Sequence, residues 1–221
     1  MTKIRIEVFR KTMKSIFGLF VFSIGDYLTI IANIGLTPWD SLSMAIANRT
    51  GLSFGRISIV ISFIIIVIDL ILKENIGLGT VLDALLVGTF IDTFTIIFKI
   101  PYASNVLIAL VYISFGLLIM ACGQTLYMSA GLSCGPRDSL LVAVSKRFPK
   151  YDIGYIDISM KVVIILASYF LDGPIGIGTI YSMVGMGIAM NIVFKIFKFE
   201  PRDIKQENLI RTLQKLVGGN K

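Results

Sequence analysis

The sequence contains no histidine and only two cysteines, Cys122 and Cys134. Histidine is the commonest metal ligand and the usual acid–base group near neutral pH, so its absence argues against ordinary hydrolytic or metal chemistry. The two cysteines match no metal-binding or disulfide spacing, and each lies in or next to apolar sequence. We therefore expect no enzymatic activity, no metal and no cofactor, and we interpret both cysteines as packing residues.

Charged residues are also scarce. They make up 16% of the 221 residues, against roughly a quarter of a typical soluble domain. Hydrophobic residues make up 55%, and the mean hydropathy is +0.83. This composition predicts an all-α membrane protein in contact with the lipid bilayer, with room for about six spans and no separate soluble domain. A net charge of +7 would suggest nucleic acid in a soluble protein, but here we expect no nucleic-acid partner.

Six apolar segments are long enough to cross a hydrocarbon core of about 30 Å as helices. They cover residues 16–34, 54–72, 76–98, 105–130, 153–171 and 175–198. Lys and Arg gather in a basic arm (1–14), in the loop 131–152 and in the tail 199–221. The loops on the other side carry only Arg49, Arg56 and Lys99. Since basic residues anchor cytoplasmic loops, both termini are predicted to be cytoplasmic.

The chain carries an internal repeat. The stretch G-L-T-P-W-D-S-L at 35–42 returns as G-L-S-C-G-P-R-D-S-L at 131–140, and I-G-L-G-T at 76–80 returns as I-G-I-G-T at 175–179. Repeat 1 covers 15–99 and repeat 2 covers 100–198. Each holds three spans, an odd number, so the halves are predicted to insert in opposite directions, as an inverted repeat with a pseudo-two-fold axis in the membrane plane. Other matched pairs are Gly18 with Gly116, Gly25 with Gly123, Gly88 with Gly187 and Asp92 with Asn191.

A Pro-x-Asp motif starts a short helix in each half, T-P-W-D at 37–40 and G-P-R-D at 135–138. Threonine or glycine suits the N-cap, proline the first turn, and an acid at the third position can bind free N–H groups. The helices that follow, 38–49 and 136–147, are too short to span a bilayer. We expect two half-helices that enter from one membrane face or lie along it.

The two half-helices could form a binding site if the inverted symmetry brings their N-termini together near mid-depth. Their free N–H groups and dipoles would favour an anion there. Asp40 and Asp138 would instead favour a cation or a proton. Capping alone is the alternative for either Asp, since a capping residue needs no ligand.

Several acids lie inside apolar segments, where a carboxylate is costly unless it faces protein, water or a partner. Asp69 lies near a span end, Asp83 is ambiguous, and Asp157 can pair with Lys161 or Arg137. Asp26 and Asp92 are mid-span, and Gln124 and Asn191 stand at the equivalent positions of the second repeat. The candidate substrate- or ion-binding residues are Asp26, Thr37, Pro38, Asp40, Ser41, Asp92, Gln124, Pro136, Arg137, Asp138, Ser139 and Asn191.

The basic tail has one apolar helical stripe, formed by Leu209, Ile210, Leu213, Leu216 and Val217. Such an amphipathic segment is predicted to lie on the cytoplasmic membrane surface or against the loops. A cytoplasmic protein partner or a homodimer is an open alternative.

The motif at 35–42, followed by T-G-L-S-F-G at 50–55 and I-G-L-G-T at 76–80, resembles the YczE/YyaS/YitT family of bacterial integral membrane proteins. The resemblance covers roughly 15–198 and implies a multi-span protein of the bacterial plasma membrane. It implies no substrate. The second motif departs from the first, with Arg137 in place of Trp39, so any site is asymmetric.

Three functions are compatible with these patterns. Inverted repeats, broken helices and buried carboxylates favour a small secondary transporter or permease with a site between the repeats, moving a small solute, an ion or a proton. The alternative is a membrane scaffold or regulator that binds a cytoplasmic partner through the 137–150 loop and the tail. An intramembrane enzyme has little support, because the sequence shows no recognisable nucleophile–base pair.

Overall fold

The computed structural model describes residues 2–200 and 207–217. These residues form helices and connecting loops, with no β-strand among them. The helices are α1 (Thr2–Ile31), α2 (Pro38–Thr50), α3 (Phe54–Ile71), α4 (Leu78–Ile97), α5 (Val106–Met128), α6 (Pro136–Arg147), α7 (Ile153–Phe170), α8 (Ile177–Phe197) and α9 (Leu209–Val217). The prediction of an all-α protein is confirmed.

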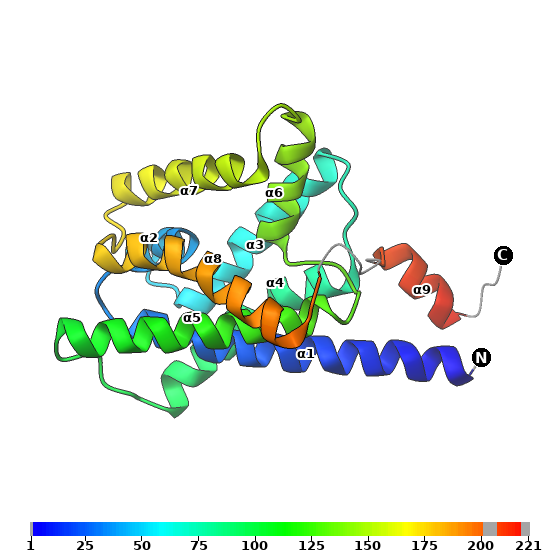
Figure 1. Cartoon of the computed structure of the whole chain (residues 1–221), viewed down its shortest axis with the longest axis horizontal. Helices are drawn as coiled ribbons and strands as arrows, with labels where there is room; N and C mark the ends of the chain where they lie inside the picture. The colour runs from blue at the N-terminus through cyan, green and yellow to red at the C-terminus, as the bar shows by residue number, and fades with distance from the viewer. Residues whose placement is uncertain (1, 201–206, 218–221) are drawn as a thin grey trace.

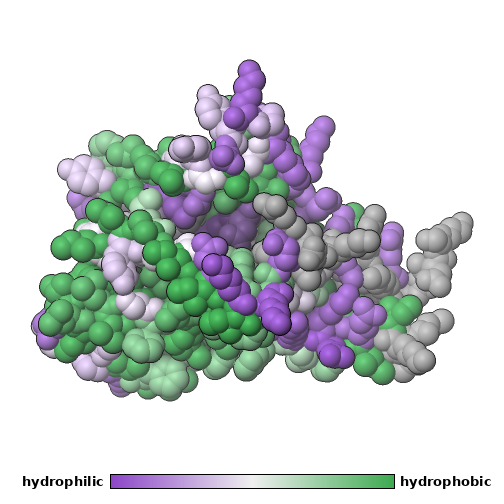
Figure 2. All heavy atoms as spheres, in the orientation of Figure 1, coloured by the Kyte–Doolittle hydropathy of each residue, from purple (hydrophilic) through white to green (hydrophobic). Residues whose placement is uncertain are grey.

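Six of the described helices are long and apolar enough to cross a membrane, namely α1, α3, α4, α5, α7 and α8. They coincide with the six predicted spans, and α2 and α6 coincide with the two predicted half-helices. Apolar side chains cover much of the surface of α5 and α8, and hydrophilic ones gather near α9 and the top of α6 (Figure 2). An apolar outer surface of this extent is what contact with lipid requires.

The start of α1 differs from the prediction. The basic arm 1–14 was expected to precede the first span, but from Thr2 onward it forms the beginning of α1 itself. No Gly or Pro occurs before Gly18, so nothing ends the helix in this stretch. Lys11 of this segment binds Glu207 at 2.8 Å, and α9 packs beside α1. The tail therefore rests on the N-terminal helix rather than standing alone.

Helices α1 and α5 run antiparallel along one side of the molecule (Figure 1). They cross at glycines: Gly18 lies against the backbone of Gly123 and Tyr127, and Gly25 against the backbone of Gly116. Small residues let membrane helices approach this closely. Adding 98 to the first-half residue of one contact and subtracting 98 from its partner gives the other contact, so Gly18–Gly123 becomes Gly116–Gly25. This is the pattern expected of two halves related by a two-fold axis.

The two halves also interlock. Half-helix α2 packs on α7 of the second half, and α6 packs on α3 of the first. The N–H of Gly79, at the start of α4, donates to the carbonyl of Leu132 at 2.7 Å, and the N–H of Gly178, at the start of α8, donates to that of Ile34 at 2.7 Å. These exchanged contacts bring the starts of α2 and α6 to the middle of the molecule.

Candidate functional site

A cavity of about 380 Å³ lies where the two halves meet. Every helix from α1 to α8, counted with its N-cap, contributes to its wall. The ionisable side chains on the wall are four carboxyl groups and two cations, together with the phenol of Tyr127: Asp40, Asp83, Asp138, Asp157, Arg137 and Lys161. Part of the wall is apolar and rich in methionine, with Met120, Met160, Met183, Met186 and Met190. The cavity therefore combines charged groups with a deformable apolar surface.

The first motif meets the second at an ion pair. Nη1 of Arg137 donates to Oδ1 of Asp40 at 3.1 Å, and the Asp40 side chain is only 2% exposed. The Thr37 hydroxyl also donates to the Asp40 carboxylate. The Arg137 guanidinium lies 5.7 Å from the centroid of the Trp39 ring, a cation–π distance. The motif residues thus bind each other across the two halves.

Thr37 is the N-cap residue of α2, as predicted, and Pro38 opens the helix. The Thr37 hydroxyl binds the carboxylate of Asp40 and does not cap a backbone N–H. Gly135 and Pro136 begin α6 in the same way. The proline-initiated starts therefore aim Asp40 and Asp138, each at the third position, toward the cavity.

Asp26 lies behind this ion pair rather than on the cavity wall. It is 1% exposed on α1 and interacts with both Asp40 and Arg137. The Thr29 hydroxyl lies 3.5 Å from its Oδ1. Asp26, Asp40 and Arg137 therefore form one buried cluster of charged side chains.

Asp138 has neutral partners. Nε2 of Gln124 and the hydroxyl of Tyr127 each donate to its Oδ2 at 3.2 Å. Asp83 of α4 abuts the start of α6, because a Cβ on Gly135 would lie 2.8 Å from Oδ2 of Asp83. Within the described ranges, neither Asp138 nor Asp83 forms an ion pair with a Lys or Arg. These two acids are the ones left without a bound counter-charge at the cavity.

Asp157 pairs with Lys161 at 2.6 Å on α7, which confirms the predicted i,i+4 pair. Both side chains line the cavity. Their repeat equivalents on α3, Ser58 and Ser62, line it as well, and Nη2 of Arg137 lies 3.5 Å from the Ser58 hydroxyl. The sequence signal for the cavity role of Asp157 and Lys161 is that the equivalent positions, Ser58 and Ser62, are also polar. This signal can be used only after α3 and α7 have been aligned.

Besides Asp26, five of the candidate residues lie away from the cavity wall. Asp92 caps α3, accepting from the Ser53 hydroxyl at 2.5 Å and from the N–H of Gly55 at 2.8 Å. Ser41 binds Ser168 of α7 at 2.7 Å. Pro136 and Ser139 are buried in α6, and Asn191 is exposed on α8. The structure brings together Thr37, Pro38, Asp40, Gln124, Arg137 and Asp138, and it adds Asp83, Tyr127, Asp157 and Lys161.

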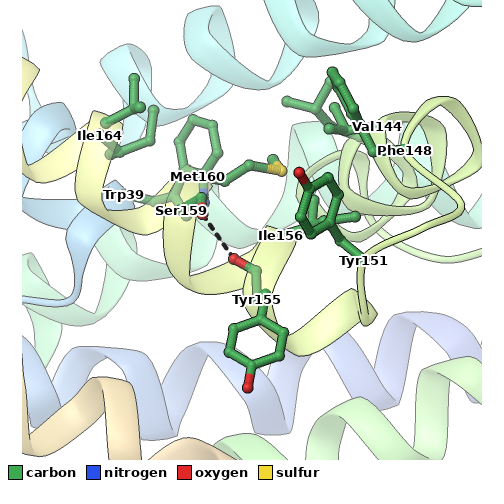
Figure 3. Close-up of a pocket in the computed structure, with 11 residues that line it drawn as sticks. Trp39, Val144, Phe148, Tyr151, Tyr155, Ile156, Ser159, Met160 and Ile164 are labelled. Carbon is green, nitrogen blue, oxygen red and sulfur yellow. Dashed lines mark hydrogen bonds between the residues drawn. The ribbon is translucent and has the colours of Figure 1, made fainter.

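A second hollow of about 480 Å³ lies between α6 and α7 and is almost entirely apolar (Figure 3). Its walls include Leu140, Phe148 and Tyr151. Trp39 and Met160 line both this groove and the central cavity, so they form part of the wall between them. The groove offers no charged group to a ligand, whereas the central cavity is lined by both half-helix motifs and is the candidate site.

Comparison with known proteins agrees with the resemblance noted in the motifs. The model of a family described as a family of unknown function (DUF6198) matches residues 9–195. The chain belongs to this family. Its relatives include the uncharacterized membrane protein YczE of Bacillus subtilis, 31% identical over 175 residues, 78% of this chain and 80% of YczE. No solved structure matches the chain.

Two further relatives are similar along most of their length. An uncharacterized protein of Haemophilus influenzae is 30% identical over 181 residues, which is 82% of each chain. The uncharacterized protein YyaS of Bacillus subtilis is 26% identical over 182 residues, 81% of this chain and 90% of YyaS. The predicted relation to YczE and YyaS is therefore confirmed, and the chain is an integral membrane protein with six apolar spanning helices.

Proposed function

We propose that the protein is a small secondary transporter or permease of the bacterial plasma membrane, with its site in the central cavity and both termini in the cytoplasm. The observation that carries this proposal is the meeting of the first turns of two half-helices, one from each half, at a cavity lined by ionisable groups. Symmetry-related halves around one charged site are the architecture of many secondary transporters. Because the sequence has no histidine, we propose transport rather than an enzymatic role.

The charges of the cavity support a cationic solute. Four lining carboxyl groups face two lining cations, and Asp26 adds a further buried acid behind them. The positive ends of α2 and α6 carry their own acids, Asp40 and Asp138, so they have little left to offer an anion. The methionines suit an apolar portion of variable shape. We assign the cavity to a small organic cation.

Binding of organic cations should depend on Asp138. This acid has no ion-pair partner among the described residues, so Asp138→Asn removes the charge without stranding a buried cation. We expect amines that stabilise the wild-type protein in a thermal-shift screen to bind roughly 10-fold more weakly to the variant, because a charge-assisted contact is lost. Neutral analogues of the same shape should not distinguish the two proteins.

The matched control is Asp172→Asn, which removes an acid 89% exposed and paired with Arg49 far from the cavity. It should bind the same amines as the wild type. Hits are then tested for counterflow in proteoliposomes. A screen in which no cation stabilises the protein, or in which Asp138→Asn responds like the wild type, would overturn the cavity assignment and favour the scaffold alternative.

The inverted topology can be tested by labelling. Asn48 at the end of α2 and Lys150 after α6 are both exposed. Single cysteines at these positions, in a protein whose Cys122 and Cys134 are replaced by alanine, should react with an impermeant maleimide from opposite sides of intact cells. Cysteine 48 should react from outside and cysteine 150 only after permeabilisation. Reaction of both from one side would contradict the inverted repeat.

A further inference from the structure

The two halves differ most clearly in the packing of their last two long helices, which are α3 and α4 in the first half and α7 and α8 in the second. In the first half, α3 packs closely on α4, and a Cβ on either Gly55 or Gly88 would overlap the other residue's carbonyl oxygen. Asp92 of α4 fastens this contact, because its carboxylate accepts from the Ser53 hydroxyl and from the N–H of Gly55. Ser53, Gly55, Gly88 and Asp92 are called the first clasp below.

The second half contains the same clasp in sequence but not in contact. Adding 99 to each residue of the first clasp gives Asp152, Gly154, Gly187 and Asn191, the second clasp. A Cβ built on Gly154 or on Gly187 would have nothing within 4 Å. Helix α7 packs on α2 and α6, whereas α8 packs on α5, and Figure 1 shows α7 set apart from α8. The glycines of the second clasp are therefore open.

The second clasp keeps the chemistry of the first with donor and acceptor exchanged. In the first clasp a hydroxyl, Ser53, donates to a carboxylate, Asp92. In the second, the carboxylate is at the helix start, on the N-cap residue Asp152, and Asn191 supplies an amide donor. The amide oxygen of Asn191 could accept the N–H of Gly154 as Asp92 accepts that of Gly55. Both halves thus carry a complete set of groups for closing one helix on the next.

The open clasp lies beside the central cavity. Met160 and Lys161 of α7 and Met183, Met186, Gly187 and Met190 of α8 are cavity walls. The start of α7 follows the loop predicted to be cytoplasmic, and the start of α3 lies on the other side. The cavity is therefore closed at the first clasp and bordered by an open clasp on the predicted cytoplasmic side.

We propose that the second clasp is a gate, and that the protein has a second state in which Gly154 packs on Gly187, Asp152 binds Asn191, and the first clasp opens. The role of this gate in moving a solute rests on the proposed function, whereas the exchange of the two clasps does not. Inverted repeats make the two states near equivalents, so each has all the contacts it needs. The chain then exposes its cavity to one side at a time.

The gate is tested by paired cysteines in native membranes, with Cys122 and Cys134 replaced by alanine. Ser53→Cys with Asp92→Cys marks the first clasp, and Asp152→Cys with Asn191→Cys marks the second. Both pairs should form disulfides under mild oxidation, detected by mass spectrometry. In the four-cysteine variant, cross-linking one pair should leave the other pair reactive to maleimide. A second pair that never cross-links, while the first does, overturns the gate.

Bulk at the second clasp provides a check that leaves the described state intact. In the described state, Gly154→Leu places its side chain in open space. The melting temperature and the first-clasp cross-linking should therefore equal those of the four-cysteine variant that keeps Gly154. Second-clasp cross-linking should fall at least ~10-fold, since overpacking acts only where α7 meets α8. Ile192→Phe, on an exposed position of α8, is the control and should cross-link normally. Equal cross-linking in Gly154→Leu and the control would contradict the gate.

The two proposals fail separately. Cross-linking needs no solute, so exchange of the clasps without any transported cation would retain the gate and overturn the transport function. Transport of a cation with a second clasp that never closes would retain the function and overturn the gate.

Discussion

Arg137→Leu should destabilise the protein by about 3 kcal/mol, because removing one partner of a buried ion pair leaves an uncompensated charge. Asp40 and Asp26 are each 1% exposed, and Arg137 is the cation with which both interact. The loss should be visible as a lower melting temperature in a mild detergent, together with lower yield from membranes. No other substitution at the cavity is expected to cost as much.

A double-mutant cycle separates the charge from the shape of the side chain. Asp40→Asn keeps the size of Asp40 and should be milder alone, because Arg137 still faces Asp26 and Asp83. Combined with Arg137→Leu, it should recover part of the lost stability, since one of the two stranded carboxylates is gone. Arg137→Leu with wild-type stability would mean that water in the cavity, rather than Arg137, compensates the two acids.

Much of the fold follows from hydrophobic length and helix-start chemistry. The six spans can be predicted because each is a long apolar run. The helix starts can be predicted because Thr-Pro, Gly-Pro and Gly-x-Gly-Thr favour a helix start whatever the rest of the fold. The early start of α1 was not predicted, since a basic arm is equally compatible with a loop or a helix. It is helical in the structure, where Lys11 reaches Glu207 of the tail.

The cavity was only partly predictable. Asp40 and Arg137 come from equivalent motifs, but their pairing depends on how the starts of α2 and α6 are placed in the fold, which no local pattern encodes. Asp92 and Asp26 look alike in sequence as mid-span acids. In the structure Asp92 caps the start of α3 and Asp26 belongs to the ion-pair cluster, because partners, not position along a helix, decide what a buried acid does.

The open second clasp could not be predicted at all. The repeat predicts that Gly154 and Gly187 are equivalent to Gly55 and Gly88, and equivalence favours identical contacts in both halves. Which of two near-equivalent contacts is formed depends on small energy differences summed over the whole molecule. The same sequence is compatible with either clasp closed.

The crossing of α1 and α5 should be sensitive to the addition of a single methyl group. Gly25→Ala adds one methyl group where the carbonyl of Gly116 and the N–H of Met120 already stand, and backbone cannot move aside as a side chain can. We expect a loss of about 2 kcal/mol, in the middle of the usual range for overpacking. Gly123→Ala should behave alike, because its Cβ would meet the backbone of Phe22 and Gly18. Thermal unfolding in one detergent measures both.

Gly154→Ala is the matched control for this prediction. Its Cβ would meet nothing within 4 Å, and Gly154 lies in the first turn of α7, where alanine is tolerated as well as glycine. The same chemical change should therefore be neutral or stabilising at 154 and destabilising at 25 and 123. Equal effects at all three positions would mean that the α1–α5 crossing is loose. A sharp difference would show that the α1–α5 crossing is closely packed, as the backbone contacts of Gly25 and Gly123 indicate.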